Sequence, residues 1–164
     1  MRLYAGDRTM NKPKPVILVI ILTLLWSVPL TRAQGNSVYF NQVESAITKR
    51  EPKWKLESKR ISKNSEMASF RWKTGKLSVG VLMIVYSSPE ETVGRIEGLV
   101  SLCDLRVLET KVNSLGNNLL WESKSDRGRG VMFTKGRFVV SVDSDSTETA
   151  ISFAEYIAAT LLAA

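Results

Sequence analysis

Apolar and polar residues follow the same order in two stretches of the chain, and each stretch predicts a strand, a tight turn, a second strand and a helix. The first stretch runs from residue 68 to about 102, with a glycine-containing turn at 73–75. The second runs from residue 131 to about 163, with a turn at 135–136. β-Branched and aromatic residues dominate the segments on both sides of each turn, which favours strands. The pattern therefore predicts two strand-turn-strand-helix units.

Polar residues mark the expected helix starts in both units. Ser88 and Glu91 have the spacing of a capping box, in which the serine oxygen accepts a backbone N–H and the glutamate reaches back to the cap. Pro89 suits the first helical position, where its missing N–H removes no bond. The second unit offers two pairs for the same role, Asp145 with Glu148 and Ser146 with Thr149. Apolar residues recur at helical spacing after each start, so we expect both helices to pack against the sheet.

The remaining apolar segments complete the predicted architecture. Segments at 56–61, 105–108 and 119–123 predict three further strands, and residues 37–49 predict an amphipathic helix that Pro52 ends. Within 77–81, apolar and small polar residues alternate, whereas 83–86 lacks alternation and predicts a strand covered on both sides. The sum is an α+β fold: an antiparallel sheet with two capped helices on one face, built from two strand-turn-strand-helix units, plus an N-terminal amphipathic helix.

The longest apolar run, at residues 16–30, predicts a targeting segment rather than part of the core. Lys12 and Lys14 precede the run, and small residues follow it at Thr31 and Ala33. This order is that of a secretory signal peptide, with cleavage between Ala33 and Gln34. The run is shorter than the roughly 20 residues that a membrane-spanning helix needs. We therefore expect a signal peptide at 1–33 and a single exported α+β domain at 34–164, periplasmic or extracellular.

Two alternatives to this interpretation of the N-terminal region stay open. Met10 begins a more conventional signal sequence than Met1, so it is a candidate for the true start. An uncleaved segment would instead leave the domain anchored to a membrane by its N-terminus.

Much of the positive charge belongs to the predicted signal peptide. The chain has 23 basic and 16 acidic residues, of which residues 1–33 contribute five and one. The remaining 18 basic and 15 acidic residues give residues 34–164 a net charge of +3. This modest charge disfavours nucleic acid as a partner.

The chain has no histidine and one cysteine, which excludes several kinds of chemistry. Ser-His and Cys-His nucleophile pairs need a histidine, and zinc sites need more histidine and cysteine ligands than this chain has. Cys103 lies in an apolar run and is expected to be a buried small hydrophobe. A single cysteine permits no intrachain disulfide, which fits a bacterial exported protein better than a small extracellular module. We therefore expect a protein that is not an enzyme and binds no metal or cofactor.

A basic segment at 49–76 is the strongest candidate for a binding surface. It holds ten lysines and arginines against three glutamates, with Trp54, Phe70 and Trp72 between them. Basic residues neutralise an anionic polymer or lipid surface, and exposed aromatic rings add stacking. The candidate surface residues are Lys53, Lys55, Lys59, Arg60, Lys63, Arg71 and Trp72. The competing interpretation is a solvated edge hairpin, in which lysines at alternate positions prevent edge-to-edge pairing.

Two other segments were weighed as sites. Asp143 and Asp145 have the spacing of the start of a calcium loop, but the glycine and terminal glutamate of that loop are missing. We therefore assign these acids to the helix start. Residues 126–130 combine arginine and glycine and could wrap a phosphate or a carboxylate, but the pattern is more typical of a hairpin loop.

These observations predict a non-enzymatic exported binding domain or envelope-associated accessory domain, whose partner is an unidentified protein or envelope component. Its binding surface would be the sheet face that the helices leave uncovered. The alternative is a binder of polyanions or anionic membrane surfaces through residues 49–76. A hydrolase that uses carboxylates would instead need two acidic side chains facing each other in a pocket.

Overall fold

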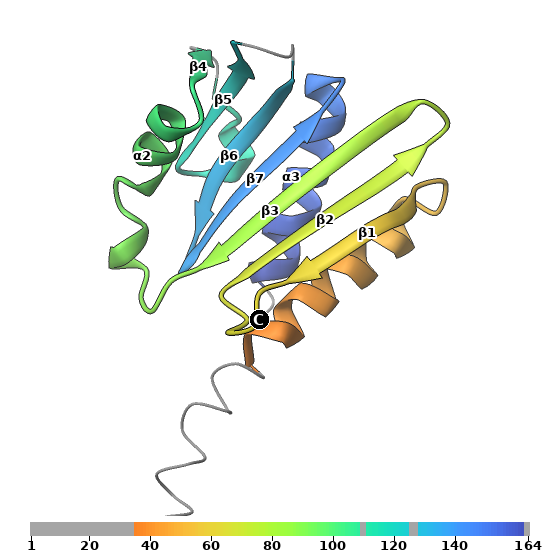
Figure 1. Cartoon of the computed structure of the whole chain (residues 1–164), viewed down its shortest axis with the longest axis horizontal. Helices are drawn as coiled ribbons and strands as arrows, with labels where there is room; N and C mark the ends of the chain where they lie inside the picture. Colours follow the sequence, from red (N-terminus) through yellow and green to blue (C-terminus); the bar gives the residue numbers. More distant parts are fainter. Residues whose placement is uncertain (1–34, 109–110, 125–127, 163–164) are drawn as a thin grey trace, which may run out of the picture. The chain divides into compact units, whose positions relative to one another are not determined.

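The computed structural model describes residues 35–108, 111–124 and 128–162 (Figure 1). Three helices and a seven-stranded antiparallel sheet within these ranges make an α+β architecture, as predicted. None of the described helices has the length and apolar character that a membrane crossing requires. The predicted signal peptide at 1–33, its cleavage site at Ala33 and Gln34, and the alternative start at Met10 lie outside the described residues.

The first helix covers residues 35–50 and is called the N-terminal helix below. Two short 3₁₀ turns, η1 (Glu90–Thr92) and η2 (Asn113–Leu115), lie in the connections. The other elements are β1 (Lys55–Ile61), β2 (Met67–Thr74), β3 (Leu77–Val85), α2 (Arg95–Leu102), β4 (Leu105–Leu108), β5 (Asn118–Ser123), β6 (Arg129–Lys135), β7 (Phe138–Ser144) and α3 (Thr147–Leu162).

The strand order in the sheet is β1-β2-β3-β7-β6-β5-β4, and every neighbouring pair is antiparallel. Both predicted hairpins form, β2–β3 and β6–β7, and they join through the pairing of β3 with β7. Gly75 and Gly136 supply the positive φ angles, 58° and 53°, that the two tight turns require. The strands expected at 56–61, 105–108 and 119–123 are confirmed as β1, β4 and β5.

The N-terminal helix and α3 pack on one face of the sheet, which we call the inner face (Figure 1). The predicted helical spacing is confirmed where Phe40, Val43 and Ile47 are fully buried. From α3, Phe153 and Ile157 enter the same core. Their partners from the strands include Trp72, Val79, Val81, Met83, Val131, Phe133, Val140 and Val142. This continuous apolar layer is the main core of the protein.

The helix α2 lies on the opposite face, which we call the outer face, and this corrects the expectation of two helices on one face (Figure 1). Ile96 of α2 packs with Trp121, Met132 and Val139 in a second buried cluster. The side chains of β7 alternate between the two clusters, with Val139 facing α2 and Val140 facing α3. The physical reason is the chain path, because α2 connects β3 to β4 across three intervening strands. Such crossovers are almost always right-handed, so strand direction decides which face the helix covers.

The two predicted helix starts have different outcomes. The predicted pair of Ser146 with Thr149 is confirmed at the start of α3, where the Ser146 hydroxyl accepts the backbone N–H of Thr149 at 3.4 Å. The same hydroxyl donates to Glu148 at 2.6 Å and holds the pKa of that carboxyl below 4.5. The prediction that Ser88 and Glu91 form a capping box at the start of a helix is wrong.

The segment after β3 begins as the 3₁₀ turn η1, and α2 starts only at Arg95. Gly94 precedes α2 with a φ of 73°, a left-handed conformation that interrupts the expected continuous helix. Ser88 hydrogen-bonds to the side chain of Glu90 and lowers the pKa of that carboxyl. Glu91 accepts the backbone N–H of Ser87 at 3.1 Å. These polar contacts stabilise a turn rather than a helix N-terminus.

Two burial expectations are also corrected. Cys103 is exposed rather than buried, because it follows the last turn of α2 on the solvent side of the outer face. In β3, Leu82 and Ile84 are only half-buried, although Val81 and Met83 are in the core. The end of β3 therefore faces the core on one side only, since α2 does not extend over β3 and β2.

Candidate functional site

The outer face is divided between a half that α2 covers and a half that no described helix covers (Figure 1). We call the uncovered half, formed by the outer-face side chains of β1, β2 and β3 with Asp143 of β7, the open half. A hollow of about 330 Å³ lies within it. The polar side chains that line the hollow are Ser58, Arg60, Ser69, Arg71 and Asp143.

One row of paired residues crosses the outer face from β1 to β5. From β1 to β5 the row reads Ser58, Arg71, Gly80, Asp143, Gly130 and Trp121. Side chains at paired positions project from the same face of a sheet, so this row connects the hollow to the cluster under α2. Arg60 pairs with Ser69 in the adjacent row. Arg60 and Arg71 are therefore diagonal neighbours on adjacent strands. The Cα atoms of such neighbours are about 7–8 Å apart.

Two glycines in this row leave space that neighbouring side chains fill. A β-carbon at Gly80 would lie 2.6 Å from Oδ2 and 2.8 Å from Cγ of Asp143, so the carboxylate lies across Gly80. A β-carbon at Gly130 would lie 2.6 Å from Cζ2 of Trp121, so the indole ring lies across Gly130. The Asp143 carboxylate therefore lies over β3, one strand away from Arg71 in the same row.

Two lysines of the basic segment are neutralised by carboxylates. Nζ of Lys59 lies 2.6 Å from Oε2 of Glu44 on the N-terminal helix. Nζ of Lys73 lies 2.6 Å from Oε1 of Glu57 on β1. Both pairs are solvent-exposed, so each contributes at most about 1 kcal/mol to stability.

The two arginines of the hollow have no such partner. Within the described ranges, the guanidinium groups of Arg60 and Arg71 make no hydrogen bond and no ion pair. Both side chains are exposed and project from the same face of adjacent strands. Neighbouring like charges on a sheet repel each other. An anion bound between the two guanidinium groups would remove this repulsion.

The structure separates the other predicted surface residues from the hollow. Lys59 projects from the inner side of β1 toward the N-terminal helix. Lys53 and Lys63 are exposed in the connections before and after β1, and Nζ of Lys55 lies 3.5 Å from the carbonyl oxygen of Pro52. Of the predicted basic residues, only Arg60 and Arg71 line the hollow.

The aromatic residues of the basic segment are part of the core. Trp72 has no exposed surface, Phe70 is 3% exposed and Trp54 is 9% exposed. Phe70 and Trp72 stack on each other with centroids 5.3 Å apart, and both Trp54 and Trp72 contact the ring of Phe153. The expectation of Trp72 as a surface residue is therefore corrected, because its place in β2 puts the ring on the inner face.

The first strand has the features of a protected sheet edge. All seven residues of β1 are exposed, and among the described strands only β2 pairs with it. A β-bulge lies between Leu56 and Ser58. Because the bulge shifts the alternation, Lys55 and Lys59 do not share the single wet face that the sequence predicts. Lysines and bulges of this kind discourage pairing with another edge strand.

Sequence reasoning did not identify Ser58, Ser69, Gly80 or Asp143 as part of a site. Asp143 was assigned to the start of a helix, but it belongs to β7 and lies on the outer face beside Gly80. One local signal was available, since small or polar residues alternate with apolar residues at 69–71 and 78–80. That alternation indicates a polar outer face for β2 and β3, although it does not indicate that Asp143 lies beside them.

The side chains that line the hollow can be sorted by the chemistry they supply. Among the described residues, no group of three metal-ligating side chains comes together. Asp143 is the only carboxylate among the residues that line the hollow, so the hollow does not supply the acid pair that a carboxylate hydrolase needs. Two guanidinium groups and two hydroxyl groups instead supply hydrogen-bond donors for an anion.

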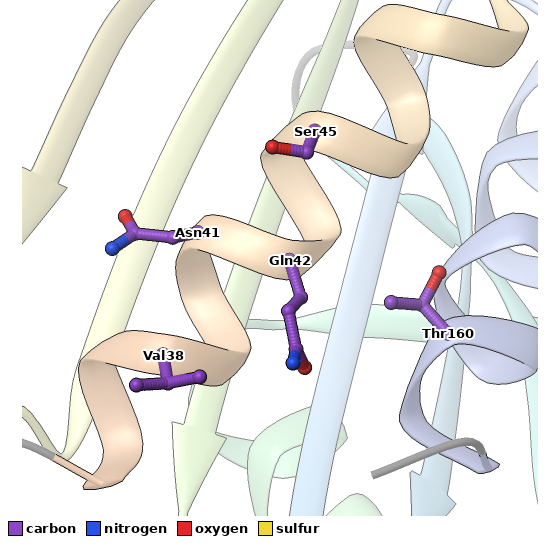
Figure 2. Close-up of a pocket in the computed structure, with 5 residues that line it drawn as sticks. All are labelled: Val38, Asn41, Gln42, Ser45 and Thr160. Atoms are coloured by element: carbon purple, nitrogen blue, oxygen red, sulfur yellow. The ribbon is translucent and has the colours of Figure 1, made fainter.

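A second cavity of about 500 Å³ lies between the N-terminal helix and α3 (Figure 2). Its lining residues are Val38, Asn41, Gln42, Ser45 and Thr160. Asn41 already accepts a hydrogen bond from Lys59 at 2.7 Å. None of these five side chains is charged, so this cavity offers no charged group to an ionic ligand.

No family model, curated protein or solved structure matches this chain.

Proposed function

We propose that the protein is a non-enzymatic exported binding domain or envelope-associated accessory domain that uses the open half of its sheet to bind an anionic ligand. One observation carries the proposal: Arg60 and Arg71 face the same hollow without a carboxylate partner in the described part of the chain. The nearby Lys59 and Lys73 both have a carboxylate partner, so the lack of one is specific to the two arginines of the hollow.

The position of the hollow also supports a binding role. The inner face is filled by apolar packing, and α2 covers the β4–β6 half of the outer face. The open half is the part of the sheet where a ligand can reach outward-facing side chains without displacing a described helix. A rigid sheet beneath the hollow keeps the arginine backbones in fixed register, which favours specific binding.

A second candidate function is the binding of polyanions or anionic membrane surfaces through the basic segment at 49–76. The observation that favours it is the exposure of Lys53, Lys55 and Lys63 along the β1 edge. Because Trp54, Phe70 and Trp72 are buried, this binding would depend on charge rather than on aromatic stacking. It would therefore weaken strongly with salt.

Two sets of substitutions in the full chain separate these functions. Arg60→Gln with Arg71→Gln changes the hollow, and the matched set Lys53→Gln, Lys55→Gln and Lys63→Gln changes the edge. We expect citrate, as a small anionic probe, to shift the backbone NMR signals of 58–60, 69–71, 80–82 and 141–143, and the arginine variant to lose these shifts. The citrate should be recovered unchanged after incubation.

The outcomes distinguish anion binding in the hollow from polyanion binding along the β1 edge. Retention on immobilised heparin that the lysine variant loses and the arginine variant keeps would establish the polyanion function instead. If neither citrate nor heparin binds the wild-type chain at low salt, both functions are contradicted.

Export has its own test, because it concerns residues 1–33. Fractionation of bacterial cells that produce the full chain should yield a protein whose N-terminus is Gln34, in the periplasm or the medium. A membrane-bound form that keeps residues 16–30 would replace export with N-terminal anchoring. The intact mass of the recovered protein distinguishes the two.

A further inference from the structure

We propose that the hollow binds the phosphate group of a phosphomonoester, with Arg60 and Arg71 as its charged ligands. This inference rests on the proposed function, because it names the ligand of the same surface. It is carried by the number, type and arrangement of the donors around the hollow.

The donors are arranged on two adjacent rows of the sheet. Ser58 and Arg71 form one pair, and Arg60 and Ser69 form the next pair. Each pair therefore presents one guanidinium group and one hydroxyl group, with the two arginines on a diagonal. A guanidinium group can donate two parallel hydrogen bonds to neighbouring oxygen atoms of one anion. Donors that converge from two strands suit an anion that has acceptors in several directions.

A phosphomonoester meets this requirement better than a carboxylate. It has three terminal oxygens arranged tetrahedrally, whereas a carboxylate has two oxygens in one plane that a single guanidinium group can satisfy. A carboxylate would therefore use one of the two arginines and leave the other without a partner. The phosphate can accept hydrogen bonds from both arginines and from Ser58 or Ser69 at the same time.

The volume and the carboxylate of the hollow limit how much negative charge it accepts. At about 330 Å³, it is at the small end of ligand-binding cavities. Asp143 lines the side of the hollow on β7, and its carboxylate lies across Gly80 of β3. The Asp143 side chain occupies this side of the hollow, so a second phosphate next to the first would have to displace it. The hollow is therefore suited to one phosphate group rather than to a diphosphate or a polyanion.

Calorimetric titration of the full chain with three small anions tests this inference. The probes are glycerol 3-phosphate, its diester glycerophosphocholine, and malonate, which carries two carboxylates. We expect glycerol 3-phosphate to bind at least about tenfold more tightly than malonate, since one tetrahedral group can reach both guanidinium groups and a serine hydroxyl, whereas malonate must fit two planar carboxylates into the same hollow. Equal or tighter binding of malonate or the diester would overturn the inference.

Arginine-to-lysine substitutions separate hydrogen-bond geometry from charge. The variant Arg60→Lys with Arg71→Lys keeps both positive charges but removes both planar donor groups. We expect it to bind glycerol 3-phosphate about tenfold more weakly than the wild type. Lys73→Gln is the matched control, because Lys73 projects from the same face but is paired with Glu57. If the lysine variant binds as tightly as the wild type, the arginines act only as point charges and the inference fails.

The phosphate can come from a soluble metabolite or from a lipid headgroup, and vesicles distinguish the two sources. Vesicles that contain phosphatidic acid present a monoester, and vesicles that contain phosphatidylglycerol present a diester. A preference for phosphatidic acid supports a lipid source, and binding of glycerol 3-phosphate without binding to either vesicle supports a soluble source. Equal binding to both vesicles would contradict monoester recognition.

Failure of this inference differs from failure of the proposed function. If citrate and malonate bind the open half as tightly as glycerol 3-phosphate, the surface is an anion site without phosphate selectivity. If no anion binds and Arg60→Gln with Arg71→Gln changes nothing, both proposals fail.

Discussion

The two halves of the outer face belong to the same sheet but differ in almost every physical property. Under α2, Trp121, Met132 and Val139 are at most 7% exposed and form a compact apolar cluster. In the open half, Arg60 and Arg71 are exposed, and their side chains make no ion pair within the described structure. The residues change from exposed and polar to buried and apolar along a single row of paired positions. The strand pairing is the same throughout the row, so it does not explain the difference between the halves.

The path of the chain explains why one half stays uncovered. The connection from β3 through α2 to β4 crosses only β7, β6 and β5. Strands β1 and β2 lie on the other side of β3, beyond the reach of this crossover. The two remaining helices both pack on the inner face. The topology thus leaves this half of the rigid sheet uncovered. Its outward-facing polar side chains are accessible to water or to a ligand.

The largest contrast between the halves should be in stability. Trp121→Ala should lower the free energy of unfolding by about 3–5 kcal/mol, because it empties a buried site between α2 and the sheet. Arg71→Ala should change it by no more than about 0.5 kcal/mol, since the side chain is exposed and makes no described ion pair. Urea denaturation followed by circular dichroism measures both. Equal losses for the two variants would show that the open half also contributes packing.

Gly80 should be the position in the open half where the backbone tolerates least change. Gly80→Ala places a β-carbon against the Asp143 carboxylate and should cost about 1–3 kcal/mol of unfolding free energy. The cost should be smaller in a chain that also carries Asp143→Ala, because that side chain is then truncated. A double-mutant cycle by urea denaturation gives the coupling energy. Additive effects would mean that Asp143 moves away from Gly80 without cost.

A smaller effect is expected from the charge of Asp143 on anion binding. Asp143→Asn removes a negative charge from the side of the hollow and should strengthen glycerol 3-phosphate binding about threefold, as expected for a solvated charge several ångströms away. Calorimetric titration at low and moderate salt measures the change, which should shrink as salt rises. A weaker affinity in the variant would show that the carboxylate positions the arginines rather than repelling the ligand.

The sequence predicted the parts of the fold that depend on local pattern. Alternation identifies the strands because side chains on a strand alternate between faces, and Phe40, Val43 and Ile47 follow helical spacing. Ser146 was identified as a cap for the same reason, since capping involves residues that are close in sequence. The face that α2 covers could not be predicted in this way. It depends on the order of strands in the sheet, which is set by pairings between distant residues.

The same division applies to the candidate site. Arg60 and Arg71 were identified from charge alone, although Trp72 was identified with them and is buried. Asp143 was misassigned because its position beside Gly80 depends on the pairing of β3 with β7. That pairing brings together two hairpins that are far apart in the sequence, and no local pattern reports it.

The smallest expected effect concerns a contact on the inner side, on the face opposite to the hollow. The Tyr156 hydroxyl donates a hydrogen bond to Glu51 at 3.0 Å, and this bond raises the pKa of the tyrosine above 10.0. The protonated tyrosine is thus favoured by folding, so its contribution to stability is present below pH 10.0 and is lost as pH rises through the higher folded pKa. Glu51→Gln should lower the pKa seen in a tyrosinate absorbance titration and leave glycerol 3-phosphate binding unchanged. Tyr86→Phe is the control, because it removes a tyrosine near α2 and keeps the Tyr156 contact. An altered affinity in Glu51→Gln would show that the inner and outer faces are coupled through the sheet, against the independence that the uncovered surface implies.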